Sequence, residues 1–524
     1  MKAVKSFWLF AAMMLFACHA GAANSDRNVS RLFILGGELS NSAATSVEDI
    51  DEVMPRMAAL GLNTVLVPAY WDLIEPVEGQ YDWTLVDRVI DKARDNRLQV
   101  IFLWFGVWKN SMSCYAPLWF KQDVKRFPRA MTRSGKPLEI ASAFSEQVFQ
   151  ADCKVFTRLV EHLAQKDPLK ETVIMLQIEN EIGMLEDARD HSPLAEDIHR
   201  KSKYPDTSEG DEAFMAEHYA RYVERLAQVA RRIYNVPLYV NAAMNSRGRK
   251  PGEYPSAGPL AHLAPIWKKY APSIDMLAPD IYDTGFKGWA CQYALPDNPL
   301  FIPESRCCEN SGVRALYVMG EHRAVGFSPF AIDQAPAAET RPVTQAYGLL
   351  RQLKPYLRAA EKYPSWGLLF SEDDKERVIA DGDVVLTCRH NFTLPWDPRA
   401  TDGTPWPEGG GIIIRLSRHE YLVAGSGIVV EWKTKTEKQQ EQQRQLGEDG
   451  FVEKGNRQQS SPAAGQPKFK GKRLGIGFVD QVSIADDGTF RYIRRDNGDQ
   501  DHQGRHARIG VGEYKILHVK LYEY

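Results

Sequence analysis

The sequence predicts an α/β protein in which a (β/α)8 TIM barrel is followed by an all-β, sandwich-like domain. From about Arg31 to Tyr363, short apolar runs alternate with longer amphipathic stretches, as in buried parallel strands that alternate with helices. After about Ser365 the helical periodicity disappears, and short apolar runs are separated by Gly, Asp and Asn, which is typical of a β-sandwich. We therefore expect a catalytic barrel over residues 31–362 and an accessory β domain over residues 365–524.

Eight strand–helix units can be placed in order along the first segment. The first four strands are continuously apolar, and four weaker runs continue the series; together they cover residues 32–35, 64–67, 100–105, 173–178, 238–240, 276–278, 300–302 and 324–327. Helical candidates have apolar residues three and four apart; they cover residues 47–60, 85–93, 148–163, 214–233 and 343–357. Eight units in about 330 residues indicate a (β/α)8 barrel. An open doubly wound sheet is the alternative, but no GxGxxG follows the first strand.

The second segment contains several short strand candidates, at residues 384–387, 411–416, 421–424, 428–432 and 490–493. Between them, residues 433–472 are rich in Lys, Gln, Glu and Gly and contain few apolar residues. Such a composition cannot bury enough apolar surface to form a core, so we predict a long exposed insertion there.

The first residues have the order of a secretion signal. Lys2 and Lys5 precede an apolar run at 7–17, and small residues follow up to Ala22, so we expect residues 1–22 to be a signal peptide removed after Ala22. Lipoprotein-type processing at Cys18 is the alternative. The apolar run is shorter than the roughly 20 residues that span a bilayer. We expect a protein exported to the periplasm or secreted, without a membrane span.

Composition excludes several classes of function. The net charge of −3 is close to balance, so the chain lacks the excess of basic residues that is typical of nucleic-acid-binding proteins. It contains neither a CxxC pair nor an HExxH motif, and we predict no dedicated metal site and no cofactor. The sequence leaves the oligomeric state open.

The most informative segment ends the fourth predicted strand and reads Leu-Gln-Ile-Glu-Asn-Glu at 176–181. The carboxyl ends of the strands build the active sites of such barrels. If the strand continues this far, Glu179 and Glu181 share one orientation and Asn180 takes the other. Two acids and an amide are costly to bury without a function. The alternative is a solvated loop that caps the next helix.

A second carboxylate, Glu304, closes the seventh predicted strand in the run Leu-Phe-Ile-Pro-Glu-Ser-Arg at 300–306. By itself it could be a structural partner of Arg306. Together with Glu181 it indicates more, because the ends of strands four and seven face each other across the mouth of a barrel. Retaining glycoside hydrolysis needs one protonated and one ionised carboxyl about 5–5.5 Å apart, and these two acids are our candidates.

The segment Gln-Ile-Glu-Asn-Glu-Ile-Gly at 177–183 resembles the acid/base motif of glycoside hydrolase family 35, whose members are mainly β-galactosidases; related barrels of family 42 share the Asn-Glu step. Residues 67–76 and 79–83 are similar to the second-strand segment of family 35, and the resemblance covers most of residues 31–362. It implies that Glu181 is the general acid/base, Glu304 the nucleophile, and Asn180 the ligand of the sugar 2-hydroxyl. The β domain resembles the one that follows such barrels in a bacterial subgroup.

The resemblance has a departure at residues 105–110, Phe-Gly-Val-Trp-Lys-Asn, which lack the acidic residue that helps to recognise galactose in the animal enzymes. The sugar is therefore less firmly implied than the chemistry. The first hypothesis is an exo-acting β-galactosidase for terminal β-galactose of oligosaccharides or plant polysaccharide side chains. The alternatives are another retaining β-glycosidase, for glucosides, mannosides or arabinosides, and a catalytically silent carbohydrate-binding protein.

Further candidates lie at the carboxyl ends of other strands. Glu181 should have its pKa raised by a dry pocket and by the charge of Glu304. Tyr282 is placed to hydrogen-bond Glu304, although a half-buried rim tyrosine would look the same. Glu38 follows the first strand and could bind sugar hydroxyls or cap a turn. The other candidates for substrate contact are Tyr70, Trp71, Trp108, Lys109 and Asn110; core packing is the stronger expectation for either tryptophan.

Overall fold

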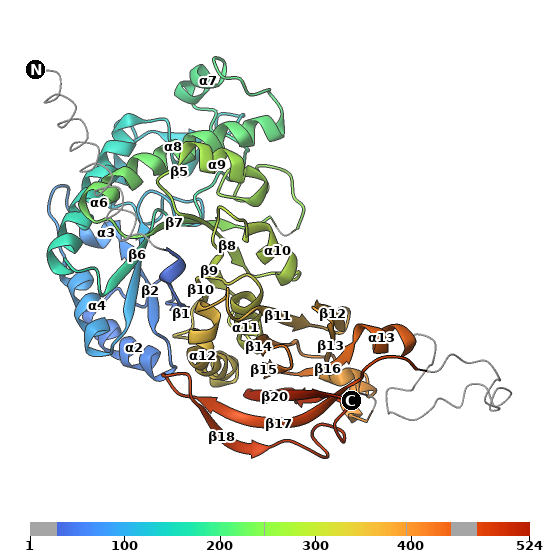
Figure 1. Ribbon diagram of the computed structural model, residues 1–524. Helices are drawn as coiled ribbons and strands as arrows, with labels where there is room; N and C mark the ends of the chain where they lie inside the picture. Colours follow the sequence, from blue (N-terminus) through green and yellow to red (C-terminus); the bar gives the residue numbers. More distant parts are fainter. Residues whose placement is uncertain (1–28, 246, 395, 442–468) are drawn as a thin grey trace, which may run out of the picture. The chain divides into compact units, whose positions relative to one another are not determined.

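The computed structural model describes residues 29–245, 247–394, 396–441 and 469–524 (Figure 1). The predicted signal peptide at 1–22 and most of the predicted insertion lie outside these residues. The described residues form two compact units. The first contains the residues up to Cys307 together with Val325–Ala335, and the second contains Cys308–Ala324 and Pro336–Tyr524.

Eight parallel strands close into a barrel in the first unit (Figure 1), which confirms the predicted fold class. Their order around the barrel is β1-β10-β9-β8-β7-β6-β3-β2. Their bounds are β1 Ile34–Glu38, β2 Thr64–Tyr70, β3 Gln99–Phe105, β6 Val173–Gln177, β7 Leu238–Ala243, β8 Met276–Ile281, β9 Phe301–Ser305 and β10 Gly326–Pro329.

The strands are apolar along almost their whole length because both faces of the sheet are covered. β2 and β3, for example, pair over seven residues, from Thr64 with Gln99 to Tyr70 with Phe105. Acidic and amide side chains appear within the last three residues of five strands, as Glu38, Gln177, Asn241, Asp280 and Glu304. The barrel thus places its buried polar groups at one rim, where the active sites of this fold are built.

Helices surround the strands of the first unit, and the longer ones begin at side-chain caps. Ser46, Ser145 and Thr207 accept hydrogen bonds from backbone N–H groups of the first turns of α2, α6 and α8, which stabilises these termini. The helices are α2 Val47–Ala59, α4 Thr84–Asp95, α6 Glu146–Lys166, α8 Ser208–Ile233, α9 Ala264–Tyr270 and α10 Phe286–Tyr293, with the short α3 Trp71–Ile74, α5 Leu118–Gln122 and α7 Pro193–His199. A hairpin of β4 Arg129–Met131 and β5 Pro137–Ala141 was not predicted. In the part of the chain that the structure describes, no helix has an apolar stretch long enough to cross a membrane.

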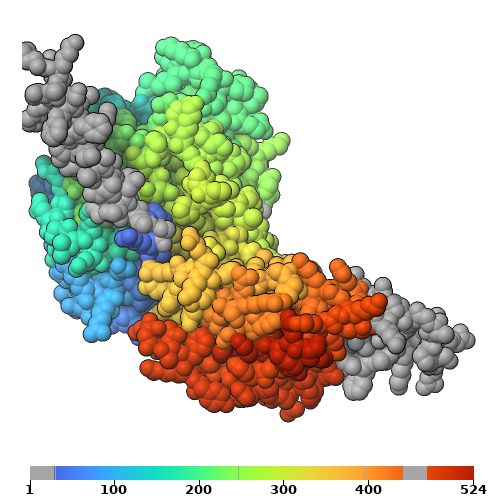
Figure 2. Space-filling view, viewed as in Figure 1, coloured from blue at the N-terminus to red at the C-terminus, as the bar shows by residue number. Residues whose placement is uncertain are grey.

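The second unit contains two antiparallel sheets, which confirms the predicted all-β region, together with helices α11 Ser311–Glu321 and α12 Ala337–Arg358. The six-stranded sheet has the order β11 Ser365–Phe370, β14 Gly409–Ser417, β15 Glu420–Ser426, β20 Lys515–Glu523, β17 Leu474–Ile484 and β18 Phe490–Arg495. The four-stranded sheet has the order β12 Glu376–Asp381, β13 Val384–His390, β16 Ile428–Thr434 and β19 Ala507–Ile509. α13 Lys435–Glu441 starts within the predicted insertion. In Figure 2 the surface of this unit is coloured from yellow through orange to red.

α11 packs closely on the six-stranded sheet within the second unit. A Cβ atom at Gly320 would lie 2.9 Å from Ile412 Cγ1, and one at Gly367 would lie 2.4 Å from the carbonyl oxygen of Tyr317. Only glycine therefore allows helix and strands this close an approach. Two ion pairs also hold α11 within this unit, Arg314 with Glu408 at 2.7 Å, and Glu321 with Arg377 of β12 in the four-stranded sheet at 2.7 Å.

Candidate active site

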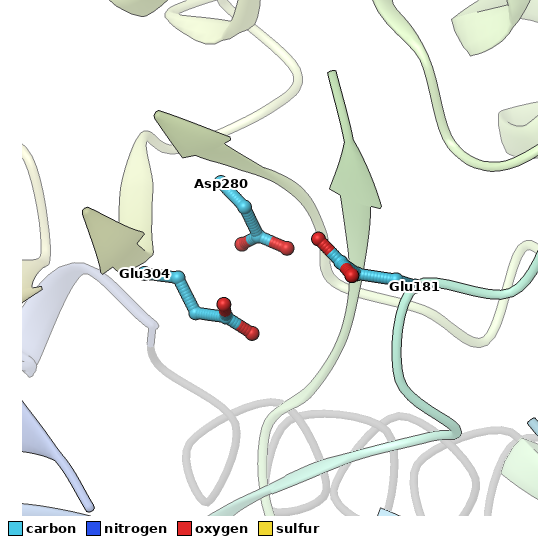
Figure 3. Close-up of side chains that lie close together, drawn as sticks. All are labelled: Glu181, Asp280 and Glu304. Atoms are coloured by element: carbon cyan, nitrogen blue, oxygen red, sulfur yellow. The ribbon is translucent and has the colours of Figure 1, made fainter. Parts of the chain in front are cut away.

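Three carboxyl groups meet at the C-terminal rim of the barrel. Glu181 follows β6, Asp280 lies in β8 and Glu304 lies in β9, and Figure 3 shows their side chains converging. One oxygen atom from each carboxyl lies within 4.8 Å of the other two. The three residues are only 6%, 2% and 3% exposed, respectively. The structure thus brings together the two predicted carboxylates and adds a third that the sequence had not singled out.

The backbone around Glu181 is held in an unusual conformation. β6 ends at Gln177, and both Glu179 (φ 57°) and Glu181 (φ 45°) adopt the left-handed conformation, which is costly for residues other than glycine. The expected strand-like orientation of Glu179 and Glu181 is therefore not found. The backbone N–H of Glu181 donates to Asn241 Oδ1 at 2.9 Å, and its carbonyl oxygen accepts from the backbone N–H of Ser111 at 3.1 Å. These contacts fix the backbone from which the Glu181 side chain enters the site.

Three donors converge on the carboxyl of Glu304. Oε1 accepts hydrogen bonds from Asn180 Nδ2 and Asn241 Nδ2, both at 3.2 Å, and Oε2 accepts one from the Tyr282 hydroxyl at 2.7 Å. Tyr282 thus makes the predicted hydrogen bond, and Asn180, predicted to bind the sugar 2-hydroxyl, contacts the same carboxyl. The three bonds fix the orientation of the carboxyl, as an attacking carboxylate requires.

Glu181 holds its proton up to neutral pH. Burial raises the pKa of Glu181 to about 7, and the charge of Glu304 adds to this effect. The charge of Lys109 and hydrogen bonds from Asp280 and Asn110 oppose it; the Asn110 amide donates to Glu181 Oε2. Glu181 can therefore act as a proton donor near neutrality, whereas an ordinary exposed carboxyl could not.

Lys109 is a buried cation among the carboxylates. Burial alone would lower its pKa, but the charges of Glu304, Glu181 and Glu38 outweigh this effect and raise the pKa above the ordinary value. Clusters of three carboxyls can hold a divalent cation, but here an ammonium group already supplies positive charge, and we assign no metal ligand.

Glu38 has unused hydrogen-bonding capacity. It is fully buried, and no N–H or O–H donor of the described residues reaches either carboxyl oxygen. Burial, followed by the charge of Glu304, raises the pKa of Glu38 well above the usual carboxyl range. A buried polar group without a partner is costly, and a sugar hydroxyl could supply the missing partner.

The aromatic candidates lie away from the three carboxyls. Trp71 is fully buried, donates from Nε1 to Glu75 and packs against Phe120. The ring of Trp108 is also fully buried and packs against Tyr222. Tyr70 contacts Phe105 and borders a separate cavity. The structure does not bring these three rings to the carboxyl cluster, and for both tryptophans it shows core packing.

Behind the site lies a second carboxyl pair, Glu179 and Asp152. Burial raises the pKa values of both groups, and the charge of Asp152 raises that of Glu179 further. Asp152 accepts hydrogen bonds from Trp104 Nε1 at 2.9 Å and from the Tyr222 hydroxyl at 2.8 Å, while Glu179 accepts one from the backbone N–H of Trp108 at 2.7 Å. Glu179 therefore anchors the loop that carries Lys109 and does not point into the site.

Sequence reasoning missed Asp280, Asn241 and Trp289. Asp280 and Asn241 interrupt otherwise apolar strand ends, and this could have revealed them, as could the alternation that puts Asp280 on the same face as Tyr282. Trp289 lies in α10 and borders a cavity of about 190 Å³ beside Glu181. α10 was not predicted from the sequence, and no sequence motif marks Trp289.

The comparisons with known proteins match two separate segments of the chain. Residues 41–230 match the model of glycoside hydrolase family 42, described as beta-galactosidase, and residues 343–508 match a domain of unknown function. The first match includes Asn180 and Glu181 and ends before Glu304. No curated protein matches the chain.

Solved structures of two beta-galactosidases are similar to the chain. One is a polyextremophilic enzyme from the Antarctic haloarchaeon Halorubrum lacusprofundi, with 16% identity, a TM-score of 0.45, and coverage of 61% of this chain and 58% of that one. The other is from Rahnella sp. R3, with 15% identity, a TM-score of 0.46, and coverage of 63% and 57%. This chain thus spans less than two thirds of the length of either enzyme. The family match lies within the barrel unit.

Proposed function

We propose that the protein is a retaining β-galactosidase that removes terminal galactose from oligosaccharides or plant polysaccharide side chains, with Glu181 as the general acid/base and Glu304 as the nucleophile. One observation carries the chemistry. Carboxyl oxygens of these two residues lie within 4.8 Å of each other, close to the roughly 5–5.5 Å of retaining enzymes and below the roughly 6.5–9.5 Å of inverting ones. The match of residues 41–230 supports galactose as the sugar.

In the first step the Glu304 carboxylate attacks the anomeric carbon and forms an ester. The bond from that carbon to the glycosidic oxygen breaks, and the leaving oxygen takes the proton of Glu181. Tyr282, Asn180 and Asn241 hold the attacking carboxylate, and Lys109 offsets the charge that remains on Glu181 once its proton has left.

In the second step water replaces Glu304 on the sugar. The ester is neutral, so the charge that had raised the pKa of Glu181 is gone, and Glu181 can act as a base. It takes a proton from water while the water oxygen bonds to the anomeric carbon and the Glu304 carboxylate leaves. Two displacements at one carbon retain the β configuration.

The leaving group is best accommodated by the cavity beside Glu181. Its lining includes the acid/base Glu181, Met244, Tyr282 and Trp289, but not the nucleophile Glu304. A group whose oxygen receives the proton of Glu181 must lie on this side. The half-buried indole of Trp289 can cover the C–H face of a second sugar ring, so we propose a saccharide leaving group.

Two other functions remain as alternatives. Another retaining β-glycosidase would use the same carboxyl pair, and residues 105–110 lack the acidic residue that helps to recognise galactose in the animal enzymes of family 35. A silent carbohydrate-binding protein would have no need of two buried carboxyls at this spacing. The resemblance at 177–183 and at Glu304 supports kinship with family 35, and the family match supports kinship with family 42.

A panel of aryl β-glycosides tests the proposal directly. We expect the galactoside to be the best substrate and the first sugar released to be β-galactose, as seen by proton NMR before mutarotation. Preference for another glycoside would refute the choice of sugar, and initial release of the α-anomer would refute retention. No hydrolysis of any glycoside, together with sugar binding measured by calorimetry, would favour the silent binding protein.

A further inference from the structure

The third carboxyl of the site has a role of its own. We propose that Asp280 is a neutral carboxylic acid that donates a hydrogen bond to Glu181 and so sets the pH range in which Glu181 works. This inference rests on the proposed function and names a further positioning residue for it.

The contacts of Asp280 leave one oxygen without a donor. Oδ2 accepts a hydrogen bond from Asn241 Nδ2 at 2.8 Å. Oδ1 is completely buried, and no donor among the described residues reaches it. One oxygen of the Asp280 carboxyl lies within 4.8 Å of one oxygen of the Glu181 carboxyl, and Figure 3 shows the two groups facing each other. Carboxylates only accept hydrogen bonds, so a hydrogen bond between the two groups requires a proton on one of them.

The charges around Asp280 favour its neutral form. The carboxyls of Glu38, Glu181 and Glu304 face it, whereas Lys109 is the cation that acts on this cluster. The other titratable groups that sense it are the phenols of Tyr239, Tyr282 and Tyr293. Asp283 borders the same cavity. Four carboxylates cannot all be ionised beside one ammonium group at this depth. Burial, followed by the charges of Glu304 and Glu181, raises the pKa of Asp280 well above its ordinary value.

The neutral acid has a defined effect in each step. Before catalysis both carboxyls of the pair are protonated. Glu181 carries the proton for the leaving group, and Asp280 carries its own. When Glu181 gives its proton away, Asp280 keeps its own and donates a hydrogen bond to the new carboxylate. Asp280 thereby stabilises the ionised form of Glu181 and keeps its pKa near 7 despite complete burial. No proton is transferred from Asp280 to substrate, so it positions and tunes Glu181.

Two substitutions separate a neutral donor from a buried charge. The amide of Asp280→Asn still donates to Glu181, whereas Asp280→Leu has a similar size and no donor. For hydrolysis of phenyl β-galactoside, whose leaving group needs a proton, the alkaline limb of kcat/KM should stay in place in Asp280→Asn. In Asp280→Leu it should move up by about one pH unit, because one hydrogen bond to the Glu181 carboxylate is lost.

An ionised Asp280 would shift the pH profile in the opposite direction. If Asp280 were ionised, both variants would remove a negative charge beside Glu181, and the alkaline limb would move to lower pH in both. That outcome overturns the proposal. Asp297→Asn is the matched control, because it removes an exposed carboxylate that pairs with Lys268 outside the site. Its profile should coincide with that of the wild type.

An infrared measurement keeps the inference testable if Asp280→Leu does not fold or if the galactosidase proposal fails. Without any substrate, the wild type should show a protonated-carboxyl stretching band at pH 8 that is lost in Asp280→Asn and kept in Glu181→Gln. A spectrum in which Asp280→Asn loses no such band refutes the neutral acid. An active wild type with that spectrum would leave the proposed function standing, and an inactive wild type whose band is lost in Asp280→Asn would leave the Asp280 assignment standing.

Discussion

Asn241 Oδ1 accepts a hydrogen bond of 2.9 Å from the backbone N–H of Glu181. Its Nδ2 atom donates to Glu304 Oε1 at 3.2 Å and to Asp280 Oδ2 at 2.8 Å. One amide in β7 therefore ties the acid/base, through its strained backbone, to the nucleophile and to the third carboxyl. The distance between acid and nucleophile depends on this side chain.

We predict that Asn241→Ala lowers kcat about 100-fold and changes KM little, because displacement of catalytic groups by about 1 Å has this effect on rate. Steady-state kinetics with 4-nitrophenyl β-galactoside measures both parameters. Asn298→Ala is the control, since Asn298 is equally buried but bonds only to the backbone of Leu277 and Tyr293. It should lower Tm and keep kcat; a similar fall of kcat in both variants would refute the role of Asn241.

Glu304→Ala should retain the fold and lose hydrolysis by about 10⁴-fold or more, because no carboxylate remains to form the ester. Azide is small enough to enter the space left by the side chain. With an activated aryl galactoside it should attack in place of Glu304 and give α-galactosyl azide. Formation of the β-azide would assign Glu304 the acid/base role, and unchanged hydrolysis would remove it from the mechanism.

The wild-type pH profile should depend on the leaving group. Glu181 must be protonated for the first step, and its pKa is about 7, so kcat/KM for phenyl β-galactoside falls as pH rises through about 7. The 2,4-dinitrophenyl galactoside needs no proton, and its kcat/KM should not show this fall. Glu181→Gln should lose about 10²–10⁴-fold on the phenyl substrate and much less on the dinitrophenyl one. Equal losses on both substrates would contradict the acid role.

Trp289→Ala tests the leaving-group cavity. We expect kcat/KM for a galactosyl disaccharide to fall about tenfold, which corresponds to ~1.4 kcal/mol of lost contact in the transition state. β-Galactosyl fluoride has no second ring, and its hydrolysis should be unchanged. Trp396→Ala removes an exposed indole in the second unit and should affect neither substrate. A fall with the fluoride as large as that with the disaccharide would place Trp289 against the galactose itself.

Glu179 provides a prediction about stability. Its pKa is raised by burial and then by Asp152, so between the unfolded and folded pKa values the folded state binds more protons, and stability falls as pH rises through this range. Glu179→Gln keeps the shape and a neutral group, so the unfolding free energy should be similar and less dependent on pH. Glu179→Ala should cost about 2–4 kcal/mol through lost packing and an unpaired Trp108 N–H. Chemical denaturation at pH 6 and 8 measures this, and a steeper pH dependence in Glu179→Gln would contradict a protonated Glu179.

The barrel could be predicted from sequence because its strands are buried on both faces and appear as unbroken apolar runs. The helices of seven and eight residues, α9 and α10, have too few turns for a periodic pattern. β17 escaped prediction because Gly475 and Gly477 interrupt its alternation.

The site could be predicted where polar residues follow a strand, as Glu181 and Lys109 do. Glu304, inside β9, was predicted because the family resemblance marks it. Asn241 and Asp280 also interrupt strands, but no motif marks them, and a single polar residue in a strand does not by itself identify its partners. Trp71 and Trp108 illustrate the opposite difficulty: a loop position after a strand does not reveal whether an aromatic ring faces the substrate or the interior.

The placement of α11 and α12 bears on how this chain can be divided. Both helices lie before residue 362, where the predicted barrel segment ends, yet they belong to the second unit. Their apolar faces are buried there, including Leu316, Met319 and Leu350. Truncation between residues 364 and 365, where the strand-rich region starts, would strip two helices of the sheet that covers them and expose an aggregation-prone surface. The β region is therefore no detachable appendage, and a shortened enzyme would have to be designed with new polar residues on these helices.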